Sequence, residues 1–236
     1  MEHFTKLHQP DGATSSSYPV VADAPPAIAG DASRVLRNTY ALLAMTLLFS
    51  AAVAAVSAAL KLPSPGILLT LAGYFGLLFL VFHQKNSVWA LPAVFALTGF
   101  MGYTLGPMLS ASLALPGGAK IVTMALGTTG VTFIALSAYV LKTRRDFSFM
   151  GGFLFAGLII ALLAGLAAVF LQMPALGLAM SAMVALLSAG LILFETSRIV
   201  NGGETNYVLA TVGLYVSIFN FFTSLMNLFG MGGIDD

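Results

Sequence analysis

The sequence predicts an all-α polytopic membrane protein, a bundle of seven transmembrane helices with the C-terminal helix at its centre. Three observations lead to this fold class. Of the 236 residues, 58% are hydrophobic and only 8% are charged, whereas soluble domains carry roughly 25% charged residues. Seven apolar segments approach or exceed the length of about 20 residues that a helix needs to span a bilayer. The last of these segments is rich in polar residues, which places it away from lipid.

The first residues of the chain differ in composition from the rest. Residues 1–33 are polar and contain several prolines and glycines, and such a segment buries too little apolar surface to offset the entropy lost on ordering. We therefore expect a disordered cytoplasmic tail over 1–33 and a membrane domain over 34–236. A secretory signal is not expected, because no apolar core of roughly 7–15 residues follows a basic start.

Short loops containing proline, glycine or charged residues separate the apolar segments. The expected transmembrane ranges are 39–60, 66–82, 88–109, 121–141, 149–171, 175–199 and 207–229. Pro107 is expected to kink or end the third helix, because proline lacks the amide hydrogen and crowds the preceding turn. Small residues spaced four apart, such as Gly102 and Gly106, let helices approach closely. We expect them mainly to pack helices within the bundle, with a dimer face as the alternative.

The positions of the basic residues predict the orientation in the membrane. Lysine and arginine accumulate in the short cytoplasmic loops of membrane proteins. If the segments alternate, eight of the ten basic residues share the side of the N-terminus, and only Lys61 and Lys120 lie opposite. The eight are Lys6, Arg34, Arg37, Lys85, Lys142, Arg144, Arg145 and Arg198. The N-terminus is therefore expected in the cytoplasm and the C-terminus on the other side.

Glu195 is the most unusual charge in the sequence, because it lies near the end of the sixth apolar segment. An ionisable group in such a place is a candidate functional residue. Arg198 follows three residues later, on the same helix face. One interpretation is a glutamate–arginine pair at the membrane edge, and the other is a buried carboxylate that binds a proton or a cation. Burial and the arginine act on this carboxylate in opposite directions, so the sequence leaves its protonation state open.

The seventh segment supplies the other candidate residues. Its polar side chains are spread around the helix, so we expect them to bond neighbouring helices or to line a cavity. A tight hairpin with the sixth segment would bring Glu195 level with Thr211. The predicted buried polar or ion site consists of Glu195, Arg198, Thr211, Tyr215, Ser217 and Asn220. Glu204, in the hairpin turn, is a secondary candidate and is expected to be an exposed residue that assists the N-cap of the last helix.

Several classes of function are not expected. The chain has no cysteine and only three histidines, so neither a disulfide nor a metal site is predicted. It contains no phosphate-binding loop, no serine-hydrolase elbow and no zinc-protease motif. We therefore expect no enzyme activity, no catalytic residue, no cofactor and no nucleic-acid partner, and a lipid bilayer as the surroundings.

A set of short strings, taken in order, is similar to a known family. The strings are Arg37–Tyr40, Leu62–Gly66, Gly99–Tyr103, Leu105–Pro107, Ser137–Leu141, Phe194–Ser197 and Gly202–Tyr207. Together they resemble the Bax-inhibitor-1-like family, also called the transmembrane BAX inhibitor motif family, over residues 34–230. The resemblance implies a seven-helix bundle in which the last helix is surrounded by the other six.

The resemblance also implies two functions. Calcium-leak members carry a pH-sensitive pair of aspartates at the positions of Glu195 and Ser217, and an arginine in the second span that this chain lacks. A serine cannot share a proton with a glutamate as a second carboxylate does. A bacterial inner-membrane branch instead modulates FtsH, a membrane-bound AAA protease. The resemblance thus implies a protein that binds an FtsH-type protease and its membrane partners and restrains membrane-protein proteolysis. The alternative is a pH-sensitive calcium or proton leak. In the first case, Glu195 is expected to be locked by hydrogen bonds to the last helix.

Overall fold

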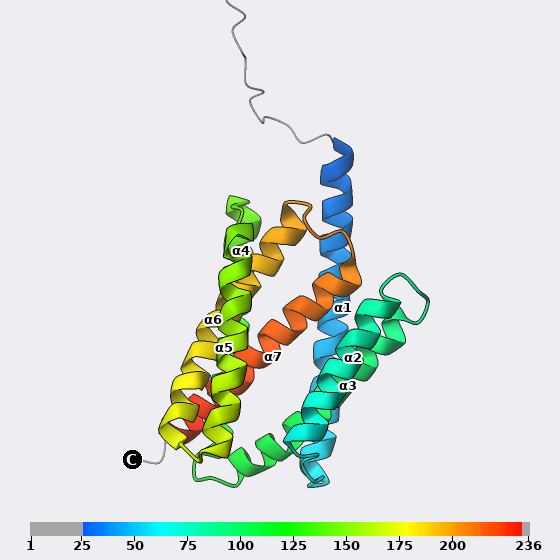
Figure 1. The fold of residues 1–236 in the computed structure, drawn as a ribbon. Helices are drawn as coiled ribbons and strands as arrows, with labels where there is room; N and C mark the ends of the chain where they lie inside the picture. Colours follow the sequence, from blue (N-terminus) through cyan, green and yellow to red (C-terminus); the bar gives the residue numbers. More distant parts are fainter. Residues whose placement is uncertain (1–25, 233–236) are drawn as a thin grey trace, which may run out of the picture.

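All seven expected transmembrane segments are helices in the computed structural model, which describes residues 26–232 (Figure 1). Each of the seven is long and apolar enough to cross a membrane. The bounds are α1 Pro26–Ala59, α2 Ile67–Gln84, α3 Ala90–Leu113, α4 Gly118–Thr143, α5 Gly151–Phe170, α6 Pro174–Val200 and α7 Tyr207–Gly232. A short 3-10 turn, η1 (Ser148–Met150), precedes α5. The predicted all-α fold class is confirmed.

The first helix begins earlier than the sequence suggested. It starts at Pro26, inside the range 1–33 that was assigned to a tail. Residues 1–25 of that predicted tail lie outside the described part of the chain, so the disorder expected there stays a prediction.

The third helix runs through Pro107 and ends only at Leu113, so of the two effects expected of this proline, a kink or an end, the second is wrong. In Figure 1 the last turns of α3, coloured green, run in a different direction from the rest of the helix. Proline removes the hydrogen bond to the carbonyl four residues earlier, which here belongs to Tyr103. The Ser57 hydroxyl of α1 donates to that carbonyl at 3.0 Å. A neighbouring hydroxyl thus satisfies the freed group, as is common in membrane helices.

Close contact between α1 and α3 depends on two glycines. A Cβ atom on Gly102 would overlap the carbonyl oxygen of Ser50, and one on Gly106 would overlap the side chain of Ser57. Glycine therefore allows the two backbones to approach where any side chain would separate them. At these positions the small residues pack helices of the same bundle, as expected.

The C-terminal helix lies in the middle of the bundle, which confirms the second part of the predicted fold class. Helix α7 packs against α1, α3, α4 and α6, and Figure 1 shows it crossing between the α2–α3 hairpin and the α4–α6 group. By contrast, α2 packs mainly on α3, and α5 mainly on α6. The loops that follow α2, α4 and α6 lie at the end of the bundle where α1 begins (Figure 1), and they bring the candidate site together there.

Candidate functional site

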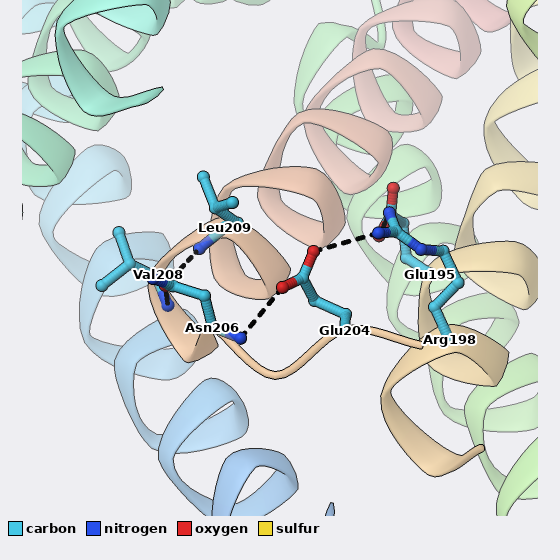
Figure 2. Close-up of polar contacts among 6 residues, drawn as sticks. All are labelled: Glu195, Arg198, Glu204, Asn206, Val208 and Leu209. Atoms are coloured by element: carbon cyan, nitrogen blue, oxygen red, sulfur yellow. Dashed lines mark hydrogen bonds and ion pairs between the residues drawn. The ribbon is translucent and has the colours of Figure 1, made fainter. Parts of the chain in front are cut away.

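Asn206 forms the N-cap of the central helix. Its side-chain oxygen accepts hydrogen bonds from the backbone amides of Val208 at 2.9 Å and Leu209 at 3.2 Å (Figure 2). These amides have no partner inside the helix, so the cap stabilises its first turn. An asparagine directly before an apolar run is an N-cap signal, but the sequence-based prediction centred on Glu204 instead.

The same asparagine attaches the central helix to the α2–α3 loop. Its side-chain nitrogen donates to the carbonyl of Lys85 at 3.1 Å and to the side-chain oxygen of Asn86 at 2.9 Å. One side chain therefore holds the start of α7 against a loop that lies about 120 residues earlier in the chain. Nothing in the spacing of these residues indicates that contact.

Glu204 supports the cap but is not the exposed residue that was expected. One carboxylate oxygen accepts the backbone amide of Asn206 at 2.9 Å, and the other accepts the guanidinium of Arg198 at 3.1 Å (Figure 2). The side chain is only 11% exposed. The arginine explains the difference, because a carboxylate with two donors can be held inside the protein surface.

Arg198 links two carboxylates. Besides Glu204, it pairs with Glu195 at 3.6 Å, and its guanidinium lies 5.5 Å from the centre of the Phe194 ring. The Glu195 side chain is 15% exposed and that of Arg198 is 32% exposed. The ion pair between Glu195 and Arg198, one of the two interpretations of the sequence, is therefore present in the structure. Together with Glu204 these residues form a charged cluster (Figure 2).

The expected hydrogen bonds between Glu195 and the last helix are absent. Within the described residues, the only polar contact of the carboxylate is Arg198, and the surface it touches on α7 is Gly213, where a Cβ atom would lie 2.8 Å from its Cδ. Ser217 donates its hydroxyl to the carbonyl of Gly213 at 2.8 Å. Short hydroxyl side chains in helices often bond the carbonyl four residues earlier, so Ser217 is not available to Glu195. This part of the prediction is wrong.

Two of the predicted residues of α7, Tyr215 and Thr211, bond other helices. Tyr215 is 1% exposed, and its hydroxyl contacts that of Ser50 at 2.6 Å and donates to the carbonyl of Thr98 at 3.3 Å. Thr211 donates to the carbonyls of Tyr207 at 2.7 Å and of Thr39 at 3.3 Å. The predicted site therefore divides into a charged cluster beside α6 and a neutral group between α7, α1 and α3.

Asn220 joins neither group. It is half-buried, and its side chain forms no hydrogen bond with any residue that the structure describes, although its carbonyl accepts the hydroxyl of Thr223 at 3.2 Å. Asn220 lies about two helical turns beyond Gly213, the residue that Glu195 touches, so the prediction grouped residues from different levels of one helix.

Ser197 is a site residue that the sequence did not reveal. Its hydroxyl is buried, accepts the backbone amide of Phe147 at 2.9 Å and donates to the carbonyl of Arg145 at 3.2 Å. Asn201 also donates to that carbonyl, at 3.5 Å. These bonds fix the basic α4–α5 loop on the last turns of α6. All three loops at this end of the bundle are thus bound to α6 or to the start of α7.

Comparison with known proteins identifies the family. The family described as "Inhibitor of apoptosis-promoting Bax1" matches residues 32–233. The chain belongs to this Bax1 inhibitor family. Family membership fits the seven helices and the central α7, and it confirms the resemblance found in the sequence.

Four relatives are similar to this chain over most of their length. "Modulator of FtsH protease YccA" of Escherichia coli K12 is 52% identical over 202 residues, covering 86% of this chain and 92% of the relative. "Uncharacterized protein PA2604" of Pseudomonas aeruginosa is 52% identical over 206 residues, covering 87% and 93%. An "Uncharacterized membrane protein" of Vibrio cholerae is 45% identical, again covering 87% and 93%. A second Escherichia coli relative is named "Inner membrane protein YccA". This chain is accordingly a multi-pass protein of the inner membrane.

Proposed function

We propose that this protein is a non-catalytic regulator that binds and modulates a membrane-anchored AAA protease of the FtsH type, and that it restrains proteolysis of membrane proteins. The observation that carries the proposal is the 52% identity, over 86% of this chain, to a protein named as a modulator of FtsH protease. Identity at this level over nearly the whole length is consistent with the same surfaces, and not only the same fold, being retained.

The charged cluster supports a role in holding a binding surface. Arg198 satisfies Glu204, Glu204 positions Asn206, and Asn206 caps α7 and holds the α2–α3 loop. We propose that Glu195, Arg198 and Glu204 together lock the α6–α7 hairpin and so keep these loops in a fixed arrangement. A proton-sharing gate has less support, because Ser217 stands where the resemblance implies a second carboxylate, and its hydroxyl bonds its own helix.

The distribution of charge supports an orientation. Arg34, Arg37, Arg198 and the basic residues at the ends of α2 and α4 lie at the end of the bundle where α1 begins, and Lys61 and Lys120 lie at the other. We propose that the basic end faces the cytoplasm. The locked loops would then lie on the side where a AAA protease has its ATPase domain, and the C-terminus would be periplasmic.

Affinity capture from solubilised membranes tests the function. We expect a membrane AAA protease to co-purify with the tagged protein and the rate of membrane-substrate cleavage to fall when the two are reconstituted together. Arg198→Gln should weaken the capture, because it removes the shared partner of two carboxylates. The control is Lys120→Gln, which alters a charge at the opposite end. A tagged protein that captures no more protease than an empty resin contradicts the proposal.

A further inference from the structure

A small cleft lies between α1, α4 and α6 at the basic end of the bundle, away from the charged cluster. Its volume is about 120 Å³, far below the roughly 300–1,000 Å³ of sites that enclose a metabolite. Its lining residues are Ala32, Ser33, Leu36, Leu141, Arg144 and Val200. Arg144 is the only charged member, and except for Ser33 the others are apolar. A cleft of this size and chemistry suits a single anionic group attached to an apolar molecule.

The backbone around Arg144 is fixed. Helix α4 ends at Thr143, and Arg144 takes a left-handed conformation with φ of 50° while its amide donates to the carbonyl of Val140 at 2.7 Å. The next residues are held by Ser197, which bonds the carbonyl of Arg145 and the amide of Phe147. The arginine therefore belongs to a rigid loop and not to a freely moving one.

Arg144 has no anionic partner among the residues that the structure describes. Among the residues described, the only ion pairs are those of Arg198. The acid closest in sequence, Asp146, accepts the backbone amide of Ser148 at 2.8 Å. Hydrogen bonds from Ser148, and to a lesser degree from Ser197, hold the pKa of the Asp146 carboxyl below its usual value. The carboxylate thus already has its partners, and no acidic residue in the described part of the chain pairs with the guanidinium of Arg144.

A second arginine lies near the same cleft. Arg37 follows the lining residue Ser33 by four positions in α1, so the two lie on the same helix face one turn apart. It is exposed. Arg37 is thus a second basic residue on the helix face that contributes Ser33 to the cleft, whose other walls include leucine and valine. Basic pockets between membrane helices are typical binding sites for the headgroups of anionic lipids.

The surroundings favour a lipid over a soluble anion. The cleft is at the level where the apolar part of α4 ends, and Leu141 in its wall is itself 38% exposed. Beyond the adjoining loop, Phe149 and Phe153 are 80% and 71% exposed, as aromatic side chains at a membrane interface are. We propose that this cleft binds the phosphate group of an anionic phospholipid, with Arg144 as its principal contact and the acyl chains running along the exposed apolar surface.

Native mass spectrometry of the full-length protein, titrated with phosphatidylglycerol, tests the proposal. We expect the wild-type protein to retain phosphatidylglycerol in preference to phosphatidylcholine. Arg144→Gln should reduce that retention about fivefold, which is the effect of losing roughly 1 kcal/mol for one basic residue at a membrane surface. Lys85→Gln is the matched control, since it removes an exposed basic residue from another loop at the same end, and it should leave retention unchanged.

A second variant tests whether the space of the cleft is needed, independently of the charge of Arg144. Val200→Phe fills the opening while keeping every charge, and it should lower lipid retention to a similar degree. Circular dichroism checks that each variant is folded, and Val200→Phe provides the test if Arg144→Gln does not fold. Equal losses in Arg144→Gln and Lys85→Gln, or wild-type retention in Val200→Phe, would show a diffuse surface charge and overturn the proposal. Displacement of the lipid by inorganic phosphate would overturn it too, by identifying a soluble anion as the ligand.

Discussion

Helices α7 and α2 are both apolar enough to span a membrane, yet they occupy opposite environments. In the most apolar part of α7, 67% of the residues are buried within the bundle, compared with 6% in α2. Their hydropathies are nearly the same. The difference lies in the polar content, because α7 carries serine, threonine, asparagine and tyrosine along its length, while α2 is almost entirely apolar.

Hydropathy therefore identifies a membrane helix but not its place in the bundle. Lipid is as apolar as leucine, so an apolar side chain gains little by leaving lipid for the protein interior. A hydroxyl or amide gains more, since in lipid it has no partner outside its own helix. Polar residues therefore determine which helix becomes central, and substitutions in α7 should have larger effects than matched ones in α2.

The largest effect is expected from Tyr215→Ala. This side chain is fully buried and its hydroxyl contacts Ser50 and Thr98, so its removal leaves a cavity and breaks the polar contacts of α7 with α1 and α3. Truncation of a buried aromatic side chain typically costs about 3–5 kcal/mol. The midpoint of thermal unfolding in detergent micelles should fall accordingly. Phe82→Ala in α2, where the ring is 51% exposed, should change the midpoint little. Similar shifts for both variants would remove the distinction between the two helices.

An intermediate effect is expected from Gly102→Ala, which adds a methyl group where α3 meets the backbone of Ser50. Overpacking of a close contact typically costs about 1–3 kcal/mol. Gly76→Ala is the matched change in α2, where nothing lies within 4 Å of the added atom, and alanine should be tolerated or slightly favourable there. Unfolding midpoints of the two variants measure the difference. A stable Gly102→Ala variant would mean that α1 and α3 can separate without loss.

The smallest effect is expected from Asn206→Ala at the start of α7. Loss of an N-cap typically costs about 1 kcal/mol, and here the link to the α2–α3 loop is lost as well. Hydrogen exchange should become faster in the first turn of α7 and in residues 85–87 before the global midpoint changes. Asn227→Ala, an exposed asparagine near the other end of the same helix, serves as the control. If exchange in Asn206→Ala were unchanged both in the first turn of α7 and in residues 85–87, the hydrogen bonds of Asn206 would contribute nothing to stability.

The arrangement of the helices could largely be predicted from the sequence, because it depends on local properties. A run of apolar residues and a polar loop are enough to place each span, and the polar residues of α7 are enough to place it centrally. Glu195 and Arg198 could be paired for the same reason, since three residues separate them on one helix.

The rest of the site depends on contacts between distant residues. Arg198 reaches Glu204 only because the hairpin loop folds back, and Ser197 bonds a loop that lies 50 residues earlier. The hydrogen-bond partner of Ser217 could not be predicted for another reason. A serine hydroxyl in a helix can bond either a neighbouring helix or the carbonyl four residues earlier in its own helix. Pro107 was also ambiguous, since its effect depended on a serine in α1.

The hydrogen bonds of Asn206 couple two parts of the bundle mechanically. One of its side-chain atoms is bonded to the first turn of α7 and the other to the loop between α2 and α3, so a force applied to that loop reaches the central helix without passing through lipid-exposed side chains. The α2–α3 hairpin is therefore mechanically coupled to the central helix α7. A partner that pulls on the hairpin would also pull on α7, and the two are expected to move together.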